Sequence, residues 1–136
     1  MCLCRFGTGI HGIHEVHRQI PAAFERIHIE VHGRGTDTAS FAEKLTSVVV
    51  TLNGATNATA TVGGVAEDTL RNIENIIGGA GDDIVTGDIL ANVLAGGGGI
   101  DTLIGGGGND TLTGGAGADK FLLTAASVSY THLTLP

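Results

Sequence analysis

From Gly78 onward, small, acidic and apolar residues return with a period of nine positions, which is far from the 3.6-residue period of a helix. Five units follow one another without an insertion, over residues 78–86, 87–95, 96–104, 105–113 and 114–122. Each unit opens with glycine, and most carry aspartate at the sixth place. A repeat kept in register predicts a repeating structural unit rather than a flexible linker. The apolar residues of the eighth place are Val85, Leu94, Leu103, Leu112 and Phe121.

Each unit is predicted to form a tight turn followed by a short strand. Glycine permits the positive φ and the close backbone approach that such turns require. The last three residues alternate outward, inward and outward, so only the eighth place faces the interior. One unit cannot bury that residue alone, but stacked units bury it in a ladder. If turns alternate between two sides, a coil of this all-β fold takes two units, and every second unit stacks at about 4.8 Å.

The composition agrees with a repeat array and excludes other classes of protein. The chain has 136 residues with 23 glycines and only 2 prolines, so it lacks the proline content and the glycine period of collagen. Its formal net charge of -7 has the wrong sign for a nucleic-acid-binding domain. No apolar run approaches the roughly 20 residues of a membrane-spanning helix. We therefore expect neither a nucleic-acid partner nor a membrane span.

The sixth-place side chains are predicted to stack in two columns. Asp83, Asp101 and Asp119 fall on one side of the coil, and Asn92 and Asp110 on the other. Carboxylates about 5 Å apart repel by about 1 kcal/mol in water, and by more when they are partly buried. A hard dication bound by carboxylate and carbonyl oxygens would offset this repulsion. The units contain no Cys or His, which disfavours zinc, and calcium fits better than magnesium, which demands a tight octahedron.

The pattern G-G-x-G-x-D-x-apolar-x resembles the hemolysin-type calcium-binding nonapeptide repeat, the RTX repeat. Four of the five units match it at every defined position. Unit 87–95 departs from it, because Asp88 and Leu90 replace the second and fourth glycines and Asn92 replaces the aspartate. The resemblance implies a right-handed parallel β-roll with calcium bound between turns of the same side.

Transferred to this sequence, the resemblance implies one ion between Asp83 and Asp101 and another between Asp101 and Asp119. A third site, between Asn92 and Asp110, is expected to be weaker or empty, because it lacks one carboxylate and a flexible turn. Glycine turns leave their carbonyl groups free to point at an ion. The candidate ligands therefore include the second- and fourth-place glycines Gly79, Gly81, Gly97, Gly99, Gly106, Gly108, Gly115 and Gly117.

The expected function is that of a calcium-binding module that folds on binding the ion. In such families the chain stays unfolded inside the cell and folds outside, and the full-length parent uses the type I secretion machinery of a bacterium. Two alternatives stay open: a metal-independent structural or adhesin solenoid, and the C-terminal tail of a secreted hydrolase whose catalytic domain is absent. No catalytic constellation is found, so no enzyme activity is expected. The sequence predicts no oligomeric state.

Residues 34–77 are predicted to form a degenerate β flank that caps the repeat array. Residues 33–37 look like one more turn, and residues 47–52 and 58–62 are predicted strands with Asn53-Gly54 in the turn between them. Glu74 aligns with the sixth place of a preceding unit, although a solvated acid is the simpler interpretation. Apolar cap contacts are expected from Ile73, Ile76 and Ile77.

The two ends differ in composition from the rest of the chain. Residues 1–33 contain five of the six histidines, and they are interpreted either as a poorly ordered leader or as out-of-frame translation from a wrongly assigned start. The H-E-V-H run at residues 14–17 is one residue too short for a zincin motif, although a histidine zinc site stays open. Residues 123–136 are interpreted as a truncated tail. Within them, residues 128–136 resemble a translated sequencing adaptor, and we expect them to be an assembly artefact.

Overall fold

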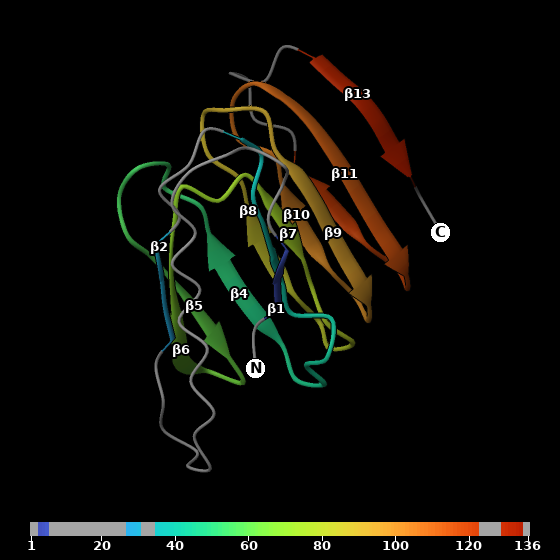
Figure 1. Ribbon diagram of the computed structural model, residues 1–136. Helices are drawn as coiled ribbons and strands as arrows, with labels where there is room; N and C mark the ends of the chain where they lie inside the picture. The colour runs from blue at the N-terminus through green and yellow to red at the C-terminus, as the bar shows by residue number, and fades with distance from the viewer. Residues whose placement is uncertain (1–2, 6–26, 31–34, 123–128, 135–136) are drawn as a thin grey trace.

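The computed structural model describes the backbone of residues 3–5, 27–30, 35–122 and 129–134 and the side chains of residues 35–122. Every regular element of these residues is a β-strand, and the strands form two sheets (Figure 1). The prediction of an all-β fold is confirmed. No helix in the described part of the chain has the length and apolar character needed to cross a membrane.

The strand order of the two sheets shows how the chain winds. The repeat strands alternate between the sheets, because each unit contributes its strand to the sheet opposite that of the unit before it. The first sheet contains, in spatial order, β1 (Leu3–Arg5), β3 (Thr38–Ser40), β7 (Asn75–Ile77), β9 (Val93–Gly98), β11 (Asn109–Ala116) and β13 (Ser129–Thr134). The second contains β12 (Lys120–Leu122), β10 (Thr102–Ile104), β8 (Ile84–Thr86), β4 (Val48–Thr51), β5 (Ala58–Val62), β6 (Val65–Arg71) and β2 (Ile27–Glu30).

The strands of the five units pair in parallel, each with the strand of the second unit along the chain. In the second sheet, Thr102 of β10 lies opposite Ile84 of β8 and Lys120 of β12. In the first sheet, Val93 of β9 lies opposite Thr111 of β11. These offsets are all two units long, so one coil takes two units, as the sequence predicts.

Pairing outside the repeat is partly antiparallel, so both sheets are mixed. Strands β4, β5 and β6 form an antiparallel meander, and β1 pairs antiparallel with β3. The predicted strands 47–52 and 58–62 are confirmed within one residue at each end. The turn between them does include Asn53 and Gly54, but the loop is longer than a two-residue hairpin. The Leu52 N–H bonds to the Thr86 carbonyl (2.8 Å), which ties this end of β4 to the repeat rather than to β5.

The flank contributes a full coil to the stack in addition to its meander. Strand β3 pairs in parallel with β7, and β4 pairs in parallel with β8. Ala39 and Val50 lie opposite Ile76 and Val85 and therefore occupy positions equivalent to the eighth place of a unit. The degenerate turn predicted at residues 33–37 thus precedes a real coil, which the sequence alone indicated only at its beginning.

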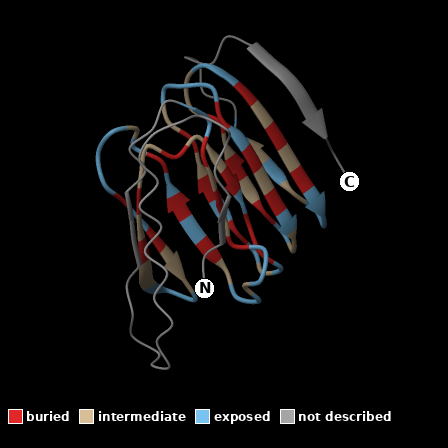
Figure 2. Cartoon of the chain, in the orientation of Figure 1, coloured by how far each residue is buried: buried red, intermediate tan, exposed pale blue. Residues whose placement is uncertain are grey.

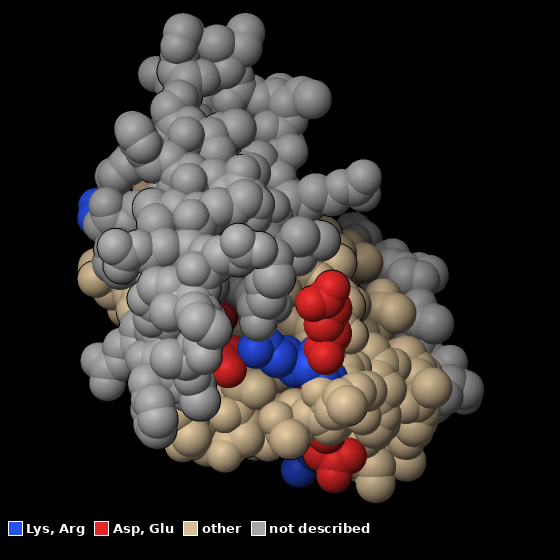
Figure 3. All heavy atoms as spheres, turned by 60° about the horizontal axis from the view of Figure 1, so that its bottom comes forward, with Lys and Arg blue, Asp and Glu red and all other residues tan. Residues whose placement is uncertain are grey.

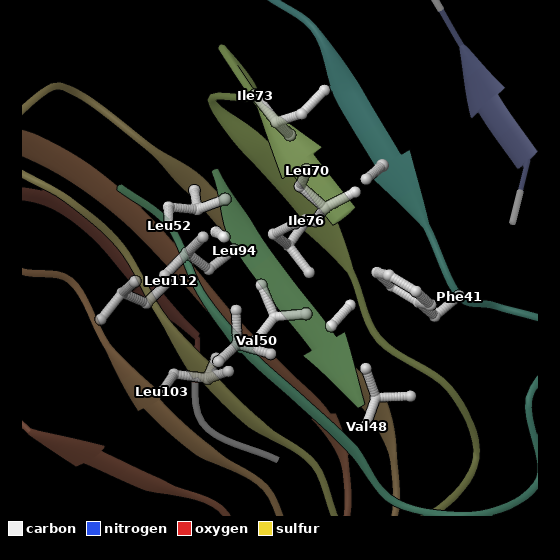
Figure 4. Close-up of a cluster of buried hydrophobic side chains, with 14 residues drawn as sticks. Phe41, Val48, Val50, Leu52, Leu70, Ile73, Ile76, Leu94, Leu103 and Leu112 are labelled. Atoms are coloured by element: carbon white, nitrogen blue, oxygen red, sulfur yellow. The ribbon is translucent and has the colours of Figure 1, made fainter. Parts of the chain in front are cut away.

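The inward side chains of both sheets form a single apolar cluster (Figures 2 and 4). Of the eighth-place residues, Phe121 alone is only partly buried, because it lies in the edge strand β12. The expected cap contacts hold for Ile73 and Ile76 but are wrong for Ile77, which is 39% exposed because strand alternation turns it outward. The cluster comprises Ala39, Phe41, Val48, Val50, Leu52, Ala58, Ala60, Leu70, Ile73, Ile76, Val85, Leu94, Leu103 and Leu112.

Three short strands lie in the segments that the sequence sets apart. Strand β1 pairs with β3, β2 pairs in parallel with β6, and β13 pairs in parallel with β11. The remainder of residues 1–33, which includes most of its histidines, and residues 123–128 and 135–136 lie outside the described residues. The leader, the histidine zinc site and the adaptor origin of residues 128–136 therefore stay predictions.

Candidate metal centre

The coil brings the sixth-place residues together in two columns, each residue stacked on its equivalent one coil away. In one column the Asp83 N–H donates to Oδ1 of Asp101 (2.8 Å), and the Asp101 N–H donates to Oδ1 of Asp119 (3.0 Å). In the other column the Asn92 N–H donates to Oδ1 of Asp110 (3.0 Å). The structure thus groups these five residues on the sides that the sequence predicts.

The carboxylates of Asp83, Asp101 and Asp110 are removed from solvent, whereas Asp119 is partly buried. Asp101 and Asp110 are each 0% exposed, and Asp83 is 1% exposed. The second oxygen, Oδ2, of Asp101, Asp110 and Asp119 is buried and has no hydrogen-bond partner. A buried carboxylate oxygen without a partner is costly and needs either a proton or a cation.

Burial also changes the acidity of these groups. Loss of solvent raises the pKa of Asp101 to about 6, against the opposing effect of the Asp83 N–H bond, and the Asp83 and Asp119 carboxylates raise it further. Burial likewise raises the pKa of Asp83 and Asp110, again against backbone N–H bonds that lower it. Without a metal ion, burial therefore makes Asp83, Asp101 and Asp110 weaker acids than a free aspartate, which is the behaviour expected where a neutralising positive charge is missing.

A pH dependence follows for the metal-free chain. The pKa of Asp101 is about 6 in the fold, compared with 3.8 for an unperturbed aspartate, so the folded state holds its proton more tightly than the unfolded state does. Stability in chelator should therefore rise as the pH falls from about 6 toward about 4, and should be lowest above about 6. Far-UV circular dichroism in chelator, compared at neutral and at mildly acidic pH, measures this gain of β signal. Loss of β signal over the same window would contradict the assignment.

The turns that carry these carboxylates stack backbone on backbone. In the last three units the second- and fourth-place glycines adopt positive φ, for example +109° at Gly97 and +100° at Gly99. A Cβ on Gly97 would collide with the Gly79 carbonyl oxygen, and one on Gly99 would lie 2.6 Å from the Gly81 carbonyl oxygen. Both the φ values and the contacts require glycine here. The same positive φ is found at Gly106, Gly108, Gly115 and Gly117.

Gly79 and Gly81 differ from these glycines, since neither adopts a positive φ. They are needed for close approach instead, because a Cβ on Gly79 would lie 2.5 Å from the Lys44 carbonyl oxygen. Below them lies the flank turn of residues 41–47, whose Lys44 carbonyl accepts the Ala80 N–H (2.9 Å). The first turn of the repeat thus packs against the flank on one side and against the glycine turn of residues 96–101 on the other.

The donor chemistry fits a hard cation. Near the first-place glycine Gly96, a Cβ would meet both Oδ2 of Asp101 and, at 2.7 Å, the carbonyl oxygen of Gly114 in the next coil. A carboxylate oxygen and a carbonyl oxygen thus face the same gap between two turns. No group of three His, Cys, Asp or Glu side chains able to hold a metal occurs among residues 35–122, so backbone carbonyls must complete any site. Oxygen ligands of this kind suit calcium.

The comparison with known families agrees with this chemistry. The model of the family described as RTX calcium-binding nonapeptide repeat (4 copies) matches residues 75–94 and 86–121. Residues 75–121 carry RTX calcium-binding nonapeptide repeats. RTX nonapeptide repeats bind calcium, and they are structural rather than catalytic units. A search of curated proteins found no match.

Two acidic residues outside the RTX repeats join the same stack. The carboxylate of Glu74 accepts the Asp37 N–H (2.8 Å), as Asp110 accepts the N–H of Asn92. The simpler interpretation of Glu74 as a solvated acid holds only in part, because its carboxylate is partly buried, accepts this hydrogen bond, and has a pKa that burial raises. The signal was present in the sequence, since both Asp37 and Glu74 stand one residue before a short strand, as the sixth place does.

Charged side chains elsewhere on the described surface are few and mixed in sign. Lys44 forms an ion pair with Glu67 (2.6 Å), and the view in Figure 3 shows basic groups next to acidic ones. A nucleic-acid-binding surface would instead gather basic groups in one patch or stripe. The described part of the face in Figure 3 has no such patch.

Proposed function

We propose that residues 35–122 form a right-handed β-roll that folds on binding calcium, as a module of a secreted bacterial RTX-type protein. The observation that carries this proposal is the buried, unpartnered Oδ2 of Asp101, Asp110 and Asp119. A cation reaching these oxygens offsets the desolvation cost, and it binds only where the coils are stacked. Binding free energy then becomes folding free energy.

The proposed ligands are the sixth-place carboxylates together with turn carbonyls of neighbouring coils. Within the stack, Asp101 is the central member of the column that runs from Asp83 to Asp119. The carbonyl of Gly114 is proposed as a backbone ligand, because it and Oδ2 of Asp101 both lie beside Gly96. Calcium supplies the positive charge that the column lacks and allows several oxygens to be bound at once.

The cellular consequence depends on where calcium is available. Extracellular calcium modules bind at about 10⁻⁴ to 10⁻³ M, well above the concentration inside a cell. On this proposal the chain leaves the cell unfolded, through the type I machinery of its full-length parent, and folds outside. The module itself contributes no catalysis; a hydrolase or an adhesin region elsewhere in the parent would supply the activity.

A calcium titration tests this function. In chelator at neutral pH, the circular dichroism of the full chain should contain a large coil component, and millimolar calcium should convert it to β signal. Equal magnesium is the control and should fail, because magnesium retains its water and demands a tight octahedron. A full β spectrum in chelator, unchanged by calcium, would instead support the metal-independent structural solenoid.

A further inference from the structure

The five turns of the repeat fall into two groups according to what their sixth-place side chain contacts. In the turns 78–83 and 87–92 the N–H of the second residue donates to that side chain: Gly79 to Oδ2 of Asp83 (2.6 Å) and Asp88 to Oδ1 of Asn92 (2.9 Å). We call these the closed turns. The turns 96–101, 105–110 and 114–119, whose sixth-place Oδ2 is buried without a partner, are the open turns.

In the closed turns every oxygen of the sixth-place side chain accepts a hydrogen bond from the protein backbone. Oδ1 of Asp83 accepts the Val48 N–H (2.8 Å), so both of its oxygens are bonded. The Asn92 amide donates from Nδ2 to the Glu74 carbonyl (3.0 Å) in addition to accepting from Asp88. Each oxygen of these two side chains therefore already has a hydrogen-bond partner, which lowers the need for a cation there.

The sequence explains why unit 87–95 is closed. Asp88 and Leu90 stand where the open turns have glycines at positive φ, a conformation that side chains disfavour. Asp88 also reaches the flank, since its Oδ2 accepts the Gly54 N–H (3.1 Å). The departures of this unit from the repeat pattern therefore replace an ion-binding turn with one that is bonded to the flank.

Apolar burial divides the chain at the same place. Among residues 35–122, twelve of the fourteen buried apolar residues precede Gly96, and Leu103 and Leu112 follow it. The three repeat carboxylates whose Oδ2 has no hydrogen-bond partner, those of Asp101, Asp110 and Asp119, all follow Gly96. The part of the stack before Gly96 thus has most of the hydrophobic stabilisation and none of the unpartnered repeat carboxylates, whereas the reverse holds after it.

We propose that the calcium requirement is confined to the open turns: residues 35–95 fold without calcium, and residues 96–122 order only when calcium reaches Asp101, Asp110 and Asp119. This rests on the proposed function and narrows it in two ways: the gap between Asp83 and Asp101 no longer needs an ion, and only residues 96–122, rather than the whole of residues 35–122, stay unfolded where calcium is scarce. The first coils then act as a preformed template, and calcium adds the later coils to their exposed strand edges.

Hydrogen exchange of the full chain, followed by mass spectrometry of its peptides, tests the division. In chelator at neutral pH, peptides from residues 35–95 should be protected and those from residues 96–122 should exchange freely; calcium should protect both. If residues 35–122 all exchange in chelator and are all protected by calcium, the division is overturned while calcium-dependent folding stands. If calcium changes the protection of no peptide from residues 35–122, calcium-dependent folding itself is overturned.

A matched pair of substitutions in one column sharpens the test. Asp101→Asn should lower the number of calcium ions bound in calorimetry and increase protection of residues 96–122 in chelator, since it removes a buried charge. Asp83→Asn should leave the number of ions unchanged and reduce protection of residues 78–95 with and without calcium, because it breaks a bond to Gly79 or Val48. If Asp83→Asn lowers the number of bound ions as Asp101→Asn does, the first gap also holds calcium and the proposal is overturned.

Discussion

Leu103→Ala should lower the free energy of unfolding in saturating calcium by about 2 to 5 kcal/mol, the usual range for a buried leucine. Leu103 is 0% exposed and lies in the middle strand of the second sheet's repeat, between Val85 on β8 and Phe121 on β12. The stacked backbones on either side cannot close the resulting cavity without breaking their ladder hydrogen bonds. Urea denaturation followed by circular dichroism measures the loss.

Ile100→Ala is the matched control for this substitution. Ile100 belongs to the same unit but is 59% exposed in the turn, and its removal should change the free energy of unfolding by no more than about 0.5 kcal/mol. Equal losses in the two variants would show that the apolar ladder does not carry the stability of the coil.

Gly97→Ala should destabilise the calcium-bound fold by about 1 to 3 kcal/mol from backbone strain alone, because Gly97 has a φ of +109°. The steric cost adds to this, since the new Cβ would collide with the Gly79 carbonyl oxygen of the preceding coil. That contact is with backbone, which cannot move aside without disturbing the turn beneath. The variant should therefore also need more calcium to reach half-maximal β signal.

Gly98→Ala provides the comparison one residue along the chain. Gly98 does not adopt a positive φ, and a Cβ there would meet nothing closer than the Ala80 Cα at 3.7 Å. Its stability and calcium midpoint should stay close to those of the unaltered chain. A similar loss in both variants would mean that glycine is needed for chain flexibility and not for the stacking of turns.

Much of the repeat could be predicted because its signals are local. The nine-residue period implies that Asp83, Asp101 and Asp119 share a side, and the backbone bonds between them follow that order. The coil formed by the flank is less predictable from sequence. Its strands β3 and β4 pair with strands that lie 37 and 35 positions further along the chain, so no local signal marks the pairing. Only the turn before Asp37 resembled a unit, so the coil it begins was recognised only in part.

The sequence by itself determined the two-unit coil, the residues of its apolar ladder and the side of each carboxylate, since strand alternation and glycine turns repeat in register. The tertiary structure decided which carboxylates keep an unpartnered oxygen. Asp83 and Asp101 both occupy the sixth place of a unit that matches the repeat pattern. Asp83 is nevertheless bonded to Val48 and Gly79, while Oδ2 of Asp101 has no hydrogen-bond partner. The difference arises because the neighbour of the first turn is the flank, and a repeat pattern carries no information about what lies beside its end.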